Sequence, residues 1–151
     1  VRRGQVDRNA LREAIDTLEN GQSVAIFPEG GIDPNLRDRV NRGEPIHAVR
    51  GHVVRESGQL IDARPGAAYL AVRTGAPIMP VAFLGTEHTL TNLRRLRRTP
   101  VSMIIGPIFG PVSLNGTPRG TERRQQLDAH LEKMMFNLAA LVPPANRGPY
   151  K

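Results

Sequence analysis

Apolar residues recur along the chain with two periods, and these periods predict helices alternating with short strands. A helical spacing predicts three helices, which lie between Asp7 and Gly21, over residues 65–75, and from Thr121 to Pro143. Uninterrupted apolar runs predict three short buried strands, over residues 23–27, 77–83 and 101–105. Because proline donates no hydrogen bond to a ladder, Pro80 in the second run predicts an edge, a bulge or a strand end.

The order of these elements predicts the fold class. Residues 1–3 look like the end of a further strand, so strand, helix and strand follow one another at the start of the chain. Such a unit pairs its two strands in parallel. The small residues Gly66, Ala67, Ala68 and Ala71 would let the second helix lie close against a sheet. We therefore expect an α/β protein with a mixed, largely parallel sheet flanked by helices.

Composition narrows the class of partner. The chain has 151 residues, a formal net charge of +7 and no cysteine. This length predicts one domain over residues 1–151, and the missing cysteines exclude disulfides and thiol nucleophiles. A basic surface suits phosphates, nucleic acid or anionic lipid. We expect no nucleic-acid partner, because aromatic residues make up only 4% of the chain and stacking platforms would be scarce.

Residues 93–98 form a short basic amphipathic segment, Leu-Arg-Arg-Leu-Arg-Arg. It fits a solvated surface or a contact with phosphate or membrane, and the pattern leaves both interpretations open. The chain has no run of the roughly 18 apolar residues that a spanning helix needs.

Residues 31–56 form a long polar segment with little periodicity. Connections of this length are usually functional or mobile. His47 and His52 lie in it, and His88 and His130 lie elsewhere, but none of the four sits in a metal-ligating or catalytic pattern. We expect no metal site.

Glu29 is a charged residue directly at the carboxyl end of the apolar run 23–27. Loops at such strand ends commonly line a ligand crevice in sheets that are flanked by helices. The alternative is a solvated turn residue, and the local pattern does not separate the two.

Residues 27–30, Phe-Pro-Glu-Gly, resemble the FPEG block of the glycerolipid acyltransferases, the bacterial 1-acylglycerol-3-phosphate acyltransferase family. Further blocks occur in the family's order: an upstream block that ends at Arg3, the region after FPEG, a fourth block at residues 78–82, and the family's usual tail at residues 141–150. The resemblance covers the chain apart from residues 31–56, which form an insert that is atypical of the family.

The chain departs from the family pattern in two places. The catalytic HxxxxD block, expected before Arg3, is absent, so we expect a fragment that carries no catalytic residue and is inactive alone. The family also follows FPEG with Thr-Arg-Ser, where this chain has Gly31-Ile32-Asp33. Arg55 is the better candidate for the arginine of that block, and Arg37 is the weaker one.

The resemblance implies transfer of a fatty acyl group from acyl-CoA or acyl carrier protein to a lysophospholipid such as 1-acylglycerol 3-phosphate, in phospholipid biosynthesis. It implies substrate binding by Arg3, Glu29, Gly30 and Arg55, with no cofactor beyond the thioester donor. A membrane surface would be a partner, and the protein would lie at the cytoplasmic face of the membrane. The alternative is a non-catalytic member of the same fold that binds anionic lipid, which the altered block after FPEG favours.

Overall fold

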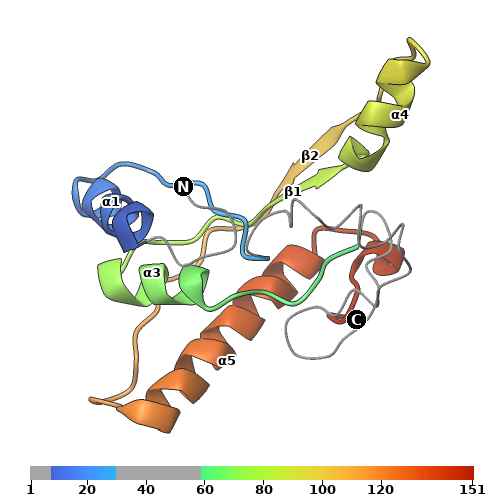
Figure 1. Ribbon diagram of the computed structural model, residues 1–151. Coiled ribbons are helices and arrows are strands. Elements are labelled where there is room, and N and C mark those ends of the chain that lie inside the picture. The colour runs from blue at the N-terminus through green and yellow to red at the C-terminus, as the bar shows by residue number, and fades with distance from the viewer. Residues whose placement is uncertain (1–7, 30–58) are drawn as a thin grey trace, which may run out of the picture.

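The computed structural model describes residues 8–29 and 59–151. Its helices and strands, in chain order, are α1 (Arg8–Glu19), α3 (Gly66–Thr74), β1 (Val81–Leu84), the short 3-10 helix η1 (Thr86–His88), α4 (Thr89–Arg94), β2 (Ser102–Ile105), α5 (Gly120–Ala139) and the 3-10 helix η2 (Pro144–Asn146). In Figure 1, α1, α3 and α5 form the body, while β1, β2 and α4 make an arm that projects from it.

The core of the described part lies between α3 and α5. The small residues Ala67, Ala68 and Ala71 of α3 form a buried cluster with Leu131 and Met134 of α5. Alanine side chains allow two helix backbones to approach closely, so the small face predicted to lie against a sheet packs against a helix. Ile78 and Phe109, which form an antiparallel bridge, also pack against this cluster, so the small residues mark the buried face of α3 and that face meets both a helix and extended chain.

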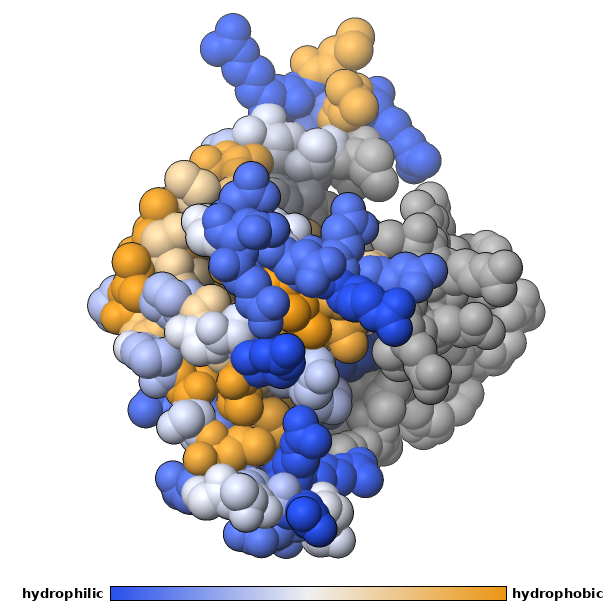
Figure 2. Space-filling model, turned by 90° about the vertical axis from the view of Figure 1, so that its left-hand side faces the viewer, coloured by the Kyte–Doolittle hydropathy of each residue, from blue (hydrophilic) through white to orange (hydrophobic). Residues whose placement is uncertain are grey.

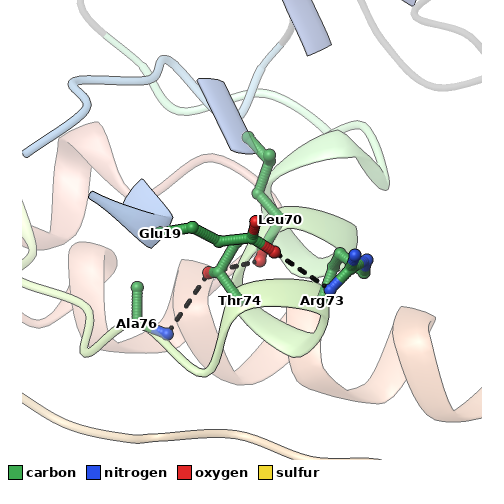
Figure 3. A network of polar contacts seen from close by, with 5 residues as sticks. All are labelled: Glu19, Leu70, Arg73, Thr74 and Ala76. Atoms are coloured by element: carbon green, nitrogen blue, oxygen red, sulfur yellow. Dashed lines mark hydrogen bonds and ion pairs between the residues drawn. The ribbon is translucent and has the colours of Figure 1, made fainter. Parts of the chain in front are cut away.

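The polar contacts drawn in Figure 3 include an ion pair that joins α3 to α1 and two hydrogen bonds at the end of α3. Glu19 Oε1, at the end of α1, lies 3.1 Å from Arg73 Nη1. The Thr74 hydroxyl donates to the Leu70 carbonyl at 2.8 Å and accepts from the Ala76 amide at 3.3 Å. The next residue, Gly75, has a φ of 64°, which is the left-handed conformation that ends a helix most easily at glycine. The predicted stop of this helix is therefore confirmed.

The strands do not form the predicted sheet. Strands β1 and β2 pair antiparallel, with Phe83 opposite Met103 and Val81 opposite Ile105. Within the described residues this two-stranded sheet replaces the expected largely parallel one, although the protein is, as predicted, a mixture of helix and strand. The arm explains the difference, because strands joined through a short helical tip turn back on themselves and pair antiparallel.

Pro80 marks a strand end, as one of the sequence interpretations proposed. Strand β1 begins at Val81, and the Pro80 carbonyl accepts a hydrogen bond from the Gly106 amide at 2.9 Å. Beyond the proline, Ile78 and Phe109 exchange a pair of backbone hydrogen bonds of 2.8 and 3.0 Å. The proline thus interrupts a longer antiparallel ribbon without separating its two sides.

The apolar run 23–27 differs most from its predicted structure, a buried strand. It is not a strand, and it is not buried: the exposed fraction is 48% for Ile26 and 76% for Phe27. A strand needs a neighbour to take its backbone hydrogen bonds. The strand expected beside this run, residues 1–3, lies outside the described residues, and no described strand pairs with it.

The last helix is shorter than its apolar pattern suggested. Helix α5 ends at Ala139, and the chain reaches Pro143 through turn hydrogen bonds such as Leu141 N to the Leu138 carbonyl at 3.1 Å. Its buried residues are Leu131, Met134, Met135 and Ala139. Among residues 8–29 and 59–151, no helix combines the length and the apolar character needed to cross a bilayer.

Candidate active site

The FPEG turn is held by residues 59–64, which begin the second described part of the chain. The half-buried carboxylate of Glu29 accepts a hydrogen bond from the Ile61 amide, with 2.8 Å between N and Oε1. One residue earlier, the Pro28 carbonyl accepts from the Arg64 amide at 2.7 Å. These two bonds fix the turn at two consecutive residues, Pro28 and Glu29. Glu29 is therefore an ordered residue at a junction of segments and not merely a solvated turn residue.

The C-terminal tail holds the other side of residues 59–64. The Leu60 amide donates to the Asn146 carbonyl at 2.9 Å, and the Ala63 amide donates to the Tyr150 hydroxyl at 3.3 Å. Gly148 lies so close to Leu60 that a Cβ at this glycine would collide with the Leu60 carbonyl. Three segments that are distant in sequence thus meet at Glu29: the FPEG turn, residues 59–64 and the tail.

Tyr150 connects this junction to the body of the protein. Its ring makes an edge-to-face contact with Phe136 of α5, with 5.8 Å between the ring centroids. Partial burial raises the pKa of the Tyr150 hydroxyl above its ordinary value of 10.0, against the opposing effect of the hydrogen bond from Ala63. The carboxylates of Asp62, Glu29 and Glu132 raise this pKa further. The hydroxyl is therefore neutral at physiological pH and accepts from the Ala63 amide as a phenol.

The other predicted substrate-binding residues are not described. Arg3, Gly30 and Arg55 lie outside the described residues, as do Arg37 and the whole 31–56 insert with His47 and His52. Their predicted roles stay predictions. Of the predicted substrate-binding set, Glu29 is the member whose surroundings the structure describes.

The two remaining histidines lie on α5 and on the arm. His130 Nε2 lies 2.9 Å from the Ser113 carbonyl, so this half-buried ring links α5 to the loop before it, as expected for a non-catalytic residue. His88 ends the exposed 3-10 helix η1 on the arm. Among the described residues, no group of three or more His, Asp or Glu side chains could hold a metal ion.

Two contributors to the junction were not predicted from the sequence. The Ile61 amide carries no side-chain signal, because any residue except proline supplies the same donor. Tyr150 follows Glu29 by more than a hundred residues, and no spacing pattern connects them. The one available signal was a lone tyrosine in a polar, proline-rich tail, since tyrosine combines an apolar ring with a hydrogen-bonding tip.

Comparison with known proteins identifies the family. No solved structure matches the chain. The family model described as Acyltransferase matches residues 1–84, which is more than half of the 151 residues and includes the FPEG turn, residues 59–64, α3 and β1. The resemblance found in the sequence is thereby confirmed: the chain belongs to the Acyltransferase family, whose chemistry is acyl transfer.

Proposed function

We propose that the protein transfers a fatty acyl group from acyl-CoA or acyl carrier protein to a lysophospholipid such as 1-acylglycerol 3-phosphate, in phospholipid biosynthesis. The observation that carries the proposal is the held FPEG turn: Glu29 is half-buried and bonded to the Ile61 amide at 2.8 Å, within the part of the chain that matches the family. A turn that is fixed at both Pro28 and Glu29 presents a constant surface to a substrate.

In the proposed reaction, the acceptor hydroxyl attacks the thioester carbonyl carbon. A C–O bond forms, the C–S bond breaks, and the thiolate leaves. The histidine of an HxxxxD block, expected before Arg3, takes the hydroxyl proton and returns it to the departing sulfur. The aspartate of that block orients the histidine, as in other His-Asp pairs. The substrate's own alcohol is the nucleophile, so no acyl-enzyme is needed.

The residues of this chain position the acceptor. The Arg3 guanidinium would hold the acceptor phosphate with two hydrogen bonds, and Arg55 would supply the second cation. Holding the phosphate brings the hydroxyl to the base in a fixed orientation, which replaces a bimolecular encounter. Gly30, without a Cβ, would let the acceptor approach the backbone closely.

Glu29 has a different role in this proposal. Its negative charge repels a phosphate, so it is not assigned to phosphate binding. Through the Ile61 amide it sets the distance between the FPEG turn and residues 59–64. It would also accept a hydrogen bond from the acceptor hydroxyl or from a neighbouring arginine. Pro80 would shape the wall of the crevice.

The proposed setting is the cytoplasmic face of a membrane. The formal net charge of +7 suits the acyl donors, the lysophospholipid and an anionic lipid surface, because all of these are negatively charged. The thioester is a co-substrate, and the proposed reaction uses no cofactor and no metal.

The test is acyl transfer by the purified full-length protein. Thiol release from acyl-CoA can be followed with a thiol-reactive dye, with the signal of the protein without donor subtracted; residues 1–151 add no thiol, because they contain no cysteine. Mass spectrometry then identifies the acylated product. We expect Arg3→Ala to raise KM for 1-acylglycerol 3-phosphate much more than for an uncharged monoacylglycerol. Equal effects on the two acceptors would remove Arg3 from the phosphate site, and no transfer to any lysophospholipid would refute the proposal.

A second candidate is a non-catalytic member of the family that binds anionic lipid. Gly31-Ile32-Asp33 favours it, because this sequence stands where the family's Thr-Arg-Ser follows FPEG. Full-length protein that binds lysophospholipid vesicles and releases no thiol would support this candidate over the first.

A further inference from the structure

The end of the arm exposes two leucines among four arginines. Helix α4 and the turn after it carry Leu93 and Leu96, whose exposed fractions are 64% and 93%. Arg94, Arg95, Arg97 and Arg98 surround them, and all four are exposed. These six residues are called the tip patch below. In Figure 1, α4 lies at the far end of the arm, away from α1, α3 and α5.

Leu96 is held outward by an unusual backbone conformation. The Arg97 amide donates to the Asn92 carbonyl at 2.8 Å, and the Leu96 amide donates to the Leu93 carbonyl at 3.0 Å. This pair of bonds is a Schellman motif, which places Leu96 at the left-handed position, with a φ of 50°. Glycine is usual at that position because a Cβ is unfavourable there. A leucine that is strained and almost fully exposed gains nothing from the fold, which points to a role in binding.

The charge around the tip patch is of one sign. Residues 88–121 contain five arginines and no aspartate or glutamate. Within the part of the chain that the structure describes, no carboxylate forms an ion pair with Arg94, Arg95, Arg97 or Arg98. Figure 2 shows strongly hydrophilic and strongly hydrophobic side chains side by side at the top of the molecule, where the arm ends.

An apolar stripe leads from the tip patch toward the body. Because side chains alternate along a strand, Phe83 and the opposed Met103 share one face of the ribbon with Ile105. Phe83 is 51% exposed and Met103 is 59% exposed. The arm therefore presents apolar side chains both at its end and along one side.

We propose that the tip patch docks on the surface of an anionic lipid bilayer, with Leu93 and Leu96 inserted at the headgroup boundary and the arginines on the phosphates. Leucine next to arginine suits this interface, because the long arginine side chain reaches the headgroups while apolar neighbours enter the acyl region. A protein partner fits less well. The apolar members of the tip patch are leucines, which are under-represented at protein hot spots, and the patch has none of the Tyr or Trp side chains that anchor such interfaces beside arginine.

This inference deepens the proposed membrane association and rests on it, but it does not require acyl transfer. It assigns the contact with the bilayer to the arm and leaves the Glu29 junction for the substrate. The two are separate in sequence and in the fold, since the junction is made by residues 28–29, 59–64 and the C-terminal tail. The arm would thereby anchor the protein by a part other than the one that holds the FPEG turn.

The charge test compares two variants of the full-length protein that lose the same number of cations. The first replaces Arg94, Arg95, Arg97 and Arg98 with glutamine, and the control replaces four exposed cations on the body, namely Arg12, Arg119, Arg124 and Lys133. Binding is measured by flotation with phosphatidylcholine vesicles that contain phosphatidylglycerol, and with phosphatidylcholine alone. Each arginine near an anionic surface contributes roughly fivefold to affinity, so the arm variant, which loses four, should bind about six-hundredfold more weakly. Equal losses in the two variants would overturn the assignment to the arm.

The leucine test separates binding from stability. Leu96→Gly relieves the left-handed strain, so its melting temperature should equal or exceed that of the wild type. Its vesicle affinity should fall by about tenfold, since burial of a leucine side chain is lost. If Leu96→Gly keeps both the melting temperature and the vesicle affinity of the wild type, Leu96 has no role in binding the bilayer.

Insertion can be followed through a tryptophan placed at the tip, with the emission of the unsubstituted full-length protein subtracted, since residues 1–151 contain no tryptophan. Leu96→Trp should shift its emission to the blue when anionic vesicles are added, and Phe136→Trp on α5 should not. A blue shift that follows protein concentration without vesicles would instead identify an interface between copies and overturn the proposal. Wild-type protein that binds no vesicle would remove membrane association altogether. Acyl transfer to detergent-dispersed acceptor, measured on the same variants, separates either failure from a failure of the proposed reaction.

Discussion

Replacing Glu29 with alanine tests whether this carboxylate organises the junction. The change removes the acceptor of the Ile61 amide, whose hydrogen bond has 2.8 Å between N and Oε1 and is half-buried. A hydrogen bond to a charged group contributes about 1.5–3 kcal/mol net, and half-burial places this one at the lower end, near 1.5 kcal/mol. A loss of that size corresponds to a melting temperature lower by about 3–6 °C in a chain of this length.

Amide hydrogen exchange followed by NMR locates the effect. If Glu29 holds residues 59–64, the Ile61 amide should exchange about tenfold faster in Glu29→Ala, because 1.36 kcal/mol is one decade. Leu60 and Ala63, which bond to the tail, should follow to a smaller degree. Glu29→Gln keeps an acceptor oxygen and should lose less protection than Glu29→Ala.

The matched control is Glu13→Ala, which removes an exposed carboxylate from α1. It should leave exchange at Ile61 unchanged. If the Ile61 amide exchanges at the same rate in Glu29→Ala as in Glu13→Ala, Glu29 does not hold residues 59–64, and its carboxylate does not fix the FPEG turn.

Three further predictions concern the body and the tail. Ala68→Leu overfills the fully buried contact between α3 and α5 and should cost about 1–3 kcal/mol of unfolding free energy in urea. Breaking the half-exposed pair between Glu19 and Arg73 with Arg73→Gln should cost at most about 1 kcal/mol, and a larger loss in the same assay would contradict its surface character. The raised pKa of Tyr150 means that the unfolded chain loses this proton first, so its contribution to stability is complete below pH 10 and declines as the pH rises above that. Tyr150→Phe should reduce that alkaline decline relative to wild type in urea titrations across this range.

Local elements were predictable from the sequence where one face or one cap decides them. The helix before Gly21 and the helix between Pro65 and Gly75 were expected and are present as α1 and α3. Helix periodicity and a glycine stop are local signals, so they survive any change of partner. The FPEG match was also local, and it led to the correct family.

Pairing between strands was not predictable in the same way. An apolar run indicates that a segment favours burial as a strand, but it does not identify the strand with which it pairs. Within the described residues, residues 23–27 pair with no strand and are largely exposed. Strands β1 and β2 pair antiparallel because the segment between them folds into η1 and α4 and turns the chain back. The antiparallel pairing depends on the fold of the tip between the two strands, about seventeen residues long, and the apolar pattern of the sequence does not predict that fold.

The sequence by itself determined the existence of α1, α3 and α5, the glycine that ends α3, the basic charge and the family. Tertiary structure decided what surrounds Glu29, because the groups that hold it are backbone amides and a tail tyrosine, which leave no pattern in the chain. It also decided the meaning of residues 93–98. Their composition allowed a solvated face or a lipid contact, whereas the fold carries them to the end of an arm and turns Leu96 outward in a glycine-like conformation. Composition sets which contacts are chemically possible, and only chain geometry sets which side chains are exposed to make them.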